Sequence, residues 1–401
     1  MAPVTLGDVT FRFAAPNLTL MGPGCSKEAG PYVKGLGAAH VLLVTDKMLA
    51  KLGMVEQIKG QLEAAGLKVT LFDSVEPDPT DKTVHAGAEV YQNNKCDALV
   101  SLGGGSSHDC AKAIGVVVTS GGNIRDYAGA DKLKTRIPPL VTINTTAGTG
   151  SEGTRISVFT NTELHLKTPI VDARCLAAVA INDPRLMVGM PPVLTAATGM
   201  DALTHAVECY VSLSATPLTD TLAIGAIKLI ARWLRPAVAN GGNLEARDKM
   251  AYAAYIAGLA FSNGRLGCSH AVAHQLGCRY GTPHGMGCAV MLPYVCEYNL
   301  IASPERFAEI AVAMGERVEG LTVMDAAAKA PAAIHKLNKD IGIPATLAEL
   351  GVKEADLEGL AREAVNDATR ANNPRQPVPF DDMLSIIRTA MGTARVKAAG
   401  V

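Results

Sequence analysis

Short apolar runs alternate with helical patterns over the first half of the chain. The runs are rich in β-branched and aliphatic residues, and the segments between them place apolar residues three and four positions apart. The predicted strands are Ala39–Val44, Lys68–Phe72, Asp97–Leu102 and Leu140–Asn144, and the predicted helices cover 52–65, 81–94 and 107–118. Because strands that alternate with helices usually form a parallel sheet, this half predicts an α/β domain. The stretch from Thr154 to Ile181 adds a predicted β-hairpin and a last strand.

Beyond Asp183 and Pro184 the apolar positions follow a helical period and strand-like runs nearly disappear. Alanine and leucine dominate these segments, and proline and glycine separate them. The predicted helices cover 193–213, 217–236, 244–262, 267–278, 304–315, 323–340, 353–368 and 380–392. The sequence therefore predicts an α/β domain over residues 1–187 and an all-helical domain over residues 188–401.

Composition agrees with a globular protein of two domains. Of the 401 residues 48% are hydrophobic and 19% charged, and a chain of this length usually exceeds one core. The net charge of −1 gives no electrostatic reason to expect a nucleic acid or an anionic membrane as partner. No apolar run approaches the roughly 20 residues of a membrane-spanning helix, and the N-terminus has no secretory pattern. We therefore expect a cytoplasmic protein.

Nine cysteines are scattered along the chain without a C-x-x-C pair. In a reducing compartment such residues are usually buried apolar side chains, and disulfides or thiolate ligands are the less favoured interpretation. The equal spacing of Cys268, Cys278 and Cys288 does not correspond to one face of a helix, and we interpret it as chance.

One carboxylate and three imidazoles form a candidate site for a divalent metal. Asp201 and His205 stand four apart in GMDALTHAVE, which places both on one face of a helix. His270 in HAVAHQLG and His284 in PHG would complete a mixed nitrogen and oxygen shell. Such a shell suits Fe(II) or Zn(II) better than Mg(II). Any one of these histidines alone is also consistent with a hydrogen-bonded core or surface residue, so the prediction depends on the set.

Two small-residue loops follow neighbouring predicted strands and form a candidate dinucleotide site. The first contains Gly103, Gly104, Gly105, Ser106 and Ser107, where free N–H groups at a helix start favour phosphate. The second contains Thr145, Thr146, Gly148, Thr149, Gly150 and Ser151. Because the strict G-x-G-x-x-G fingerprint is absent, an ordinary tight turn remains an alternative for the first loop.

The carboxylate of Asp46 lies at the end of the first predicted strand. It can accept hydrogen bonds from an adenosine ribose and would repel a 2′-phosphate. This position therefore favours NAD over NADP.

Several long motifs resemble the signatures of the iron-dependent (group III) alcohol dehydrogenases, in the right order over nearly the whole chain. They are GGGSSHDCAKAIG, TTAGTGSEGTR, GMDALTHAVE and HAVAHQLG followed by PHG. The chain is most similar to the branch of NAD-dependent methanol and short-chain alcohol dehydrogenases. The resemblance implies a dinucleotide-binding α/β domain, an all-helical metal-binding domain, and an active site between them.

The resemblance also implies roles for individual residues. It places the metal on Asp201, His205, His270 and His284, and the cofactor against Asp46, Gly103, Gly104, Gly105, Ser106, Thr145, Thr146, Thr149 and Lys167. Its usual metals are Fe(II) or Zn(II), with some members using Mg(II), and its members assemble as homo-oligomers. Gly153 departs from the family, which commonly has a β-branched residue there, and predicts a roomier substrate pocket.

The leading hypothesis is an oxidoreductase that interconverts short-chain primary alcohols and aldehydes by hydride transfer to NAD. A metal-bound alcohol loses its proton more readily, and His274, beside the substrate by resemblance, is the candidate catalytic residue that relays this proton. Alternatively, His274 only orients water or a ligand. Lys167 could equally be a solvated lysine on the surface. The competing functions are a dehydroquinate-synthase-like lyase, which shares the use of NAD and metal, and a metal-dependent hydrolase.

Overall fold

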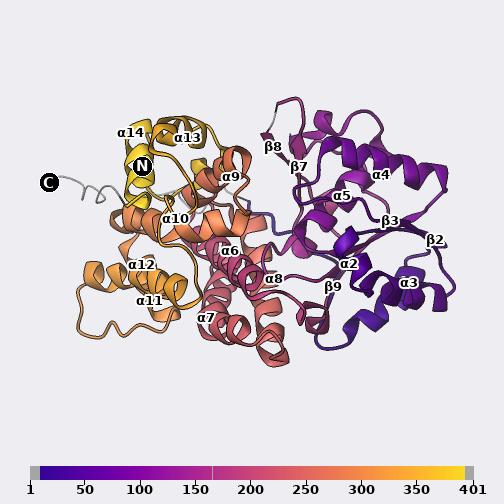
Figure 1. Cartoon of the computed structure of the whole chain (residues 1–401), viewed down its shortest axis with the longest axis horizontal. Helices are drawn as coiled ribbons and strands as arrows, with labels where there is room; N and C mark the ends of the chain where they lie inside the picture. Colours follow the sequence, from indigo (N-terminus) through magenta and orange to yellow (C-terminus); the bar gives the residue numbers. More distant parts are fainter. Residues whose placement is uncertain (1–9, 165, 393–401) are drawn as a thin grey trace.

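The computed structural model describes residues 10–164 and 166–392. The chain forms an α/β half and a helical half that lie side by side along the longest axis of the molecule (Figure 1). Residues 1–9, which include most of the N-terminal segment without a secretory pattern, lie outside the described residues.

A six-stranded parallel sheet forms the centre of the α/β half. Its order is β1 (Leu18–Met21), β9 (Val179–Asn182), β6 (Leu140–Asn144), β4 (Ala98–Gly103), β2 (His40–Val44) and β3 (Lys68–Phe72). Neighbouring strands are parallel throughout, which confirms the predicted parallel sheet. The sequence did not predict β1, because this short strand at the sheet edge is only partly buried and lacks an apolar run.

Helices cover both faces of this sheet. They are α1 (Ala29–Gly35), α2 (Lys47–Lys51), α3 (Met54–Ala64), α4 (Asp81–Asn93) and α5 (Gly105–Ser120). Along β2, Leu42 and Val44 join the core with α4 and α5, whereas Val41 and Leu43 join the core with α1 and α3. Burial on both faces explains why the strands appear in the sequence as continuous apolar runs.

A second, three-stranded sheet contains the predicted hairpin. It has the order β5 (Gly129–Ala130), β8 (Leu166–Val171) and β7 (Ile156–Asn161). β7 and β8 are antiparallel, with Ile156 opposite Val171. This sheet brings Lys167 on β8 close to the helical half.

The second half of the chain is helical, as predicted. Its helices are α6 (Pro192–Val211), α7 (Pro217–Ala239), α8 (Leu244–Gly264), α9 (Cys268–Tyr280), α10 (His284–Asn299), α11 (Pro304–Ala313), α12 (Val323–Asp340), α13 (Leu357–Ala364) and α14 (Phe380–Ala390). The sequence did not predict α10, because this helix is buried along most of its length and therefore has no polar stripe to reveal its period. Among the described residues, no helix combines the length and the apolar character that crossing a bilayer requires.

Candidate active site

The central helix α6 presents the first two predicted metal donors. Asp201 and His205 lie four residues apart on a stretch of α6 where nearly every residue is buried. The imidazole of His205 stacks on Phe261 of α8, with the ring centroids 4.1 Å apart. Helix geometry and this packing fix both side chains toward the same point.

The other two predicted donors come from α9 and α10. His270 lies in the first turn of α9, and His284 is the first residue of α10 after Pro283. Gly285 allows α10 to approach α6 closely, because a Cβ at this position would lie 3.2 Å from the Cβ of Asp201. The close approach brings His284 next to Asp201.

The four donors meet around one point. The Nε2 atoms of His205, His270 and His284 lie 3.8, 3.9 and 3.6 Å from Oδ1 of Asp201. Two donors held at about 2.1 Å by one tetrahedral ion are about 3.4 Å apart, so these separations fit a shared divalent cation. Within residues 10–164 and 166–392, Oδ1 of Asp201 and Nε2 of His270 are buried and have no hydrogen-bond partner, which costs free energy unless a cation is present.

Burial keeps two of the imidazoles neutral. It lowers the pKa of His205 to about 4 and the pKa of His284 well below its ordinary value. Both rings are therefore unprotonated near neutral pH and retain a lone pair for a metal. His270 differs, because the hydrogen bond and charge of Glu208 outweigh the effect of burial and raise its pKa.

Glu208, which was not predicted from the sequence, orients His270. Its Oε2 atom lies 2.7 Å from Nδ1 of His270, and its carboxylate also accepts hydrogen bonds from the backbone N–H groups of Gly267 and Ser269. With Nδ1 donating to Glu208, Nε2 of His270 is the nitrogen available to a metal. In the sequence, the acidic residue about one helical turn after His205 in GMDALTHAVE could have indicated this role.

Replacing Glu208 by glutamine is expected to lower metal affinity about 10- to 100-fold without abolishing folding. The amide keeps the shape of the side chain but removes the charge that holds His270 in its orientation. Chelator competition against the wild-type protein measures the effect. Unchanged metal affinity in a folded Glu208→Gln protein would show that this contact does not tune the metal donor.

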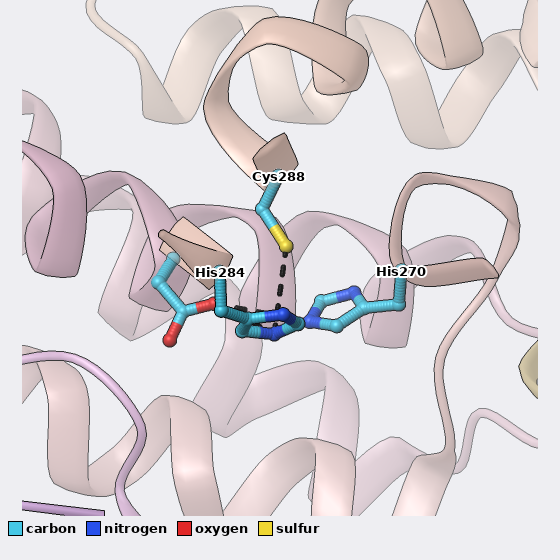
Figure 2. A group of neighbouring side chains, drawn as sticks. His270, His284 and Cys288 are labelled. Atoms are coloured by element: carbon cyan, nitrogen blue, oxygen red, sulfur yellow. Dashed lines mark hydrogen bonds and ion pairs between the residues drawn. The ribbon is translucent and has the colours of Figure 1, made fainter. Parts of the chain in front are cut away.

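Cys288 also belongs to this cluster. One donor atom from each of Asp201, His270, His284 and Cys288 lies within 4.8 Å of all the others. His205 is outside this set but adjoins it through Asp201. Figure 2 shows the sulfur of Cys288 directed toward the ring of His284. Cys288 follows His284 by four residues, a spacing that places both on one face of a helix and could have indicated this contact. The sequence-based interpretation considered only the spacing among the cysteines.

His274 lies one turn after His270 on α9 and borders the cluster. Its ring stacks near that of His284, with centroids 5.5 Å apart. Nδ1 of His274 lies 2.8 Å from Oδ2 of Asp367, which the sequence analysis also missed. Burial alone would raise the pKa of Asp367, but the hydrogen bonds from His274 and Thr369 lower it overall. Asp367 is therefore an ionised partner that fixes the orientation of His274.

The two predicted cofactor loops pack against each other at the carboxyl ends of β4 and β6. A Cβ on Gly104 would lie 2.9 Å from Oγ1 of Thr146, and a Cβ on Gly105 would lie 2.7 Å from Cγ2 of Thr149. These two glycines are required by the contact between the loops. α5 begins at Gly105, slightly before the predicted start, and has no side-chain cap on its first turn. Its N–H groups are therefore available to an anion.

The remaining predicted cofactor residues border these loops. Gly103 has a φ of 149° and ends β4, and the backbone N–H of Thr145 donates to its carbonyl. Ser106 accepts a hydrogen bond from the backbone of Asp78. Asp46 caps α2, and its Oδ1 atom accepts from the N–H groups of Met48 and Leu49.

Lys167 reaches from β8 toward the helical half. Its Nζ atom lies 2.8 Å from Oδ1 of Asp78 and close to Gly277 of α9. The side chain is 13% exposed, so it is not the solvated surface lysine that remained an alternative. It adds positive charge next to His284, whose pKa it helps to lower.

The expectation of a roomier pocket at Gly153 is wrong. Gly153 is buried in η3 (Ser151–Gly153), and a Cβ there would lie 2.8 Å from Cε2 of Tyr255 on α8. The Tyr255 ring occupies the space that a larger side chain would need, and its hydroxyl is hydrogen-bonded to Thr19. The glycine therefore permits contact between the two halves.

The fold joins a parallel sheet with a glycine-rich loop to a helical half in which a carboxylate and three imidazoles converge. This combination is expected of a metal-dependent enzyme with an α/β domain. Residues 16–184 match the family model for iron-containing alcohol dehydrogenase, and residues 195–391 match the C-terminal model of the Fe-containing alcohol dehydrogenase family. The chain therefore belongs to the iron-containing alcohol dehydrogenase family.

Individual relatives agree with this assignment. The chain is 52% identical to 1,3-propanediol dehydrogenase of Klebsiella pneumoniae over 368 residues, which cover 91% of this chain and 95% of the relative. It is 48% identical to NAD-dependent methanol dehydrogenase of Bacillus methanolicus over 380 residues, which cover 95% of this chain and 100% of the relative. The crystal structure of a 1,3-propanediol oxidoreductase matches with a TM-score of 0.94 and 51% identity, covering 95% of this chain and 100% of that one. The predicted family, fold class and enzyme class are confirmed.

Proposed function

We propose that this protein interconverts short-chain primary alcohols and aldehydes by hydride transfer to NAD at a metal held by Asp201, His205, His270 and His284. The observation that carries the proposal is the convergence of three Nε2 atoms on one buried, unpartnered carboxylate oxygen. Family membership and the names of the relatives, 1,3-propanediol dehydrogenase and methanol dehydrogenase, support the reaction type. The mixed nitrogen and oxygen donors favour Fe(II), with Zn(II) or Mg(II) as alternatives.

When bound, the divalent cation would lower the pKa of a substrate alcohol by several units and so favour loss of its proton. The chain's own residues hold the donors in place before substrate arrives. Glu208 orients His270, and Phe261 fixes the ring of His205. Because Asp201, His205 and His270 are nearly excluded from solvent, their interaction with a charged centre is screened little by water.

His274 is the proposed proton carrier. Its Nδ1 atom faces the Asp367 carboxylate, so its Nε2 atom is the one left to exchange a proton with a substrate hydroxyl or with a cofactor ribose. Asp367 stabilises the protonated imidazole, as an ionised carboxylate beside a general base does. With a side chain that is 24% exposed, His274 also connects the buried donors to solvent, where the proton must finally go.

NAD is the proposed hydride acceptor, and the first turn of α5 would hold its diphosphate. The uncapped helix start, the glycine loop and the threonine loop that packs on it support this placement. Lys167 is proposed to reach the nicotinamide ribose, and Asp46 the adenosine ribose. Asp46 uses one oxygen to cap α2, which leaves Oδ2 for ribose hydroxyls.

NADH is expected to raise the melting temperature of the protein, and NADPH to do so far less. A ligand at about 100 times its Kd adds about 2.7 kcal/mol to stability, which a thermal-shift assay detects. Replacing Asp46 by asparagine preserves the helix cap and removes the charge. We expect this variant to reduce the discrimination between NADH and NADPH about tenfold, equivalent to about 1.4 kcal/mol. An unaltered preference would contradict the role of Asp46, and no NADH effect on the wild type would favour a hydrolase.

Further proposals concern organisation and assembly. We propose a domain boundary between residues 187 and 188, since η5 (Pro184–Met187) follows the last strand of the sheet, β9, and α6 starts the helical half. Cytoplasmic location is supported by the absence of disulfides among the nine cysteines, all of which are free. We also propose a homo-oligomer, as the resemblance to the family implies. Light scattering coupled to size exclusion tests the assembly.

A further inference from the structure

Cys288 is placed by α10 on the same face as His284, one turn further along the helix. Its side chain is completely buried, and its Sγ atom lies 3.7 Å from Nε2 of His284. In Figure 2 the sulfur points at the ring of His284, while the ring of His270 approaches the same ring from the side. A thiol in this position faces the atoms that surround the proposed metal.

The distances fit a sulfur donor to the same ion. A metal about 2.3 Å from sulfur and about 2.1 Å from nitrogen places those two atoms about 3.1 Å apart at a right angle and about 3.6 Å apart at a tetrahedral angle. The observed separation between Cys288 and His284 is 3.7 Å. Among the residues that the structure describes, Oδ1 of Asp201 and Nε2 of His270 in the same group of donors are buried without a hydrogen-bond partner.

We propose that Cys288 supplies a sulfur donor to the metal centre, beside the carboxylate and the imidazoles. This inference rests on the metal site of the proposed function and adds a ligand to it. Thiolate is a soft ligand that prefers Zn(II) and Fe(II) over Mg(II). The chain is therefore expected to select against Mg(II) more strongly than nitrogen and oxygen donors alone would dictate.

Coordination requires that the thiol lose its proton. As the bond between metal and sulfur forms, the S–H bond breaks and the proton leaves to solvent, so metal uptake releases one more proton than the imidazoles and the carboxylate account for. The positive charge of a bound divalent cation would favour the thiolate, because a coordinating thiol is deprotonated.

Replacing the metal by cobalt(II) tests for a sulfur donor through the absorption spectrum, without an activity assay. Wild-type protein reconstituted with one Co(II) is expected to show a strong near-ultraviolet band from thiolate-to-cobalt charge transfer. Cys288→Ser should lose this band while still binding Co(II), and its affinity for Zn(II) in chelator competition should fall about tenfold or more. Cys296→Ser is the matched control, since Cys296 is also buried on α10 but belongs to the hydrophobic core. This control should keep the band.

X-ray absorption of the zinc-loaded wild type needs no variant and should detect a sulfur scatterer at about 2.3 Å. Stoichiometric Co(II) or Zn(II) binding without a charge-transfer band and without a sulfur scatterer would overturn the role of Cys288 and leave the proposed function intact. A band that persists in Cys288→Ser would also overturn it. Failure of the wild type to bind any divalent metal would overturn both the inference and the proposed metal site.

Discussion

Replacing His270 by alanine is expected to give a protein that retains no stoichiometric metal and has lost most of its alcohol oxidation. The change removes one of three imidazoles that face Asp201, and it leaves the buried Glu208 carboxylate without its histidine partner. Metal polarisation is worth several kcal/mol, and about 1.4 kcal/mol corresponds to a factor of ten in rate. The loss of kcat/KM should therefore be about a thousandfold or more. Elemental analysis and steady-state kinetics on the same sample measure both effects.

A second variant separates loss of the donor from loss of stability. His270→Asn keeps an N–H group that can donate to Glu208 but removes the Nε2 donor. It should fold more stably than the alanine variant and still lose the metal. His40→Asn is a control, because His40 is buried in the α/β half and hydrogen-bonded to Thr70. Full activity in either His270 variant would exclude His270 as a metal donor.

Replacing His274 by asparagine should lower kcat/KM about 10²- to 10⁴-fold, the range typical of a lost general acid or base. The metal content should stay unchanged, because His274 lies beside the donors and is oriented by Asp367. The dependence of kcat/KM on pH should also change, since the proton must then leave without an imidazole. A pH series on the metal-loaded wild type and variant tests both expectations.

The control for His274 is His335→Asn. His335 lies on α12, partly exposed and in contact with Tyr294 and Glu297, away from the donors. It should change neither activity nor its pH dependence. If His274→Asn lost activity only through raised KM, with kcat and the pH profile preserved, His274 would be an orienting residue and the proton would take another route.

The fold was largely predictable because its signals are local. Strands buried on both faces appear as apolar runs, and amphipathic helices between them reveal the α/β alternation. β1 and α10 were missed for opposite reasons: β1 is too short and too exposed, whereas α10 is buried too completely to show a polar face. Periodicity detects an element only when one side of it meets solvent.

The candidate site was predictable only as a set of residue types. Helical spacing paired Asp201 with His205, but nothing in the spacing indicates that α9 and α10 converge on α6. That convergence depends on tertiary packing, including the close approach at Gly285. The residues that orient the donors were missed for the same reason. Asp367 lies far from His274 in sequence and meets it only in the folded chain.

The effect of Gly153 on the substrate pocket could not be predicted from the sequence. A glycine in the sequence indicates absent bulk but does not tell which neighbour fills the space. Tyr255 fills it from the other half of the chain. Substrate size must therefore be decided by side chains around the donors, and apolar pockets discriminate one methylene group by only about 1–3 kcal/mol.

We propose that this protein oxidises a small alcohol with NAD, and that a divalent metal held by the helical half assists the loss of the alcohol's proton. The most direct measurement is NADH formation with a panel of primary alcohols from methanol to hexanol, using protein whose metal content has been determined. We predict NADH formation with at least one of these alcohols, and we expect ethanol or 1-butanol to be a substrate. No NADH should form after the metal is removed. Failure to turn over any alcohol in the panel, or any corresponding aldehyde with NADH, by fully metal-loaded protein would contradict the account.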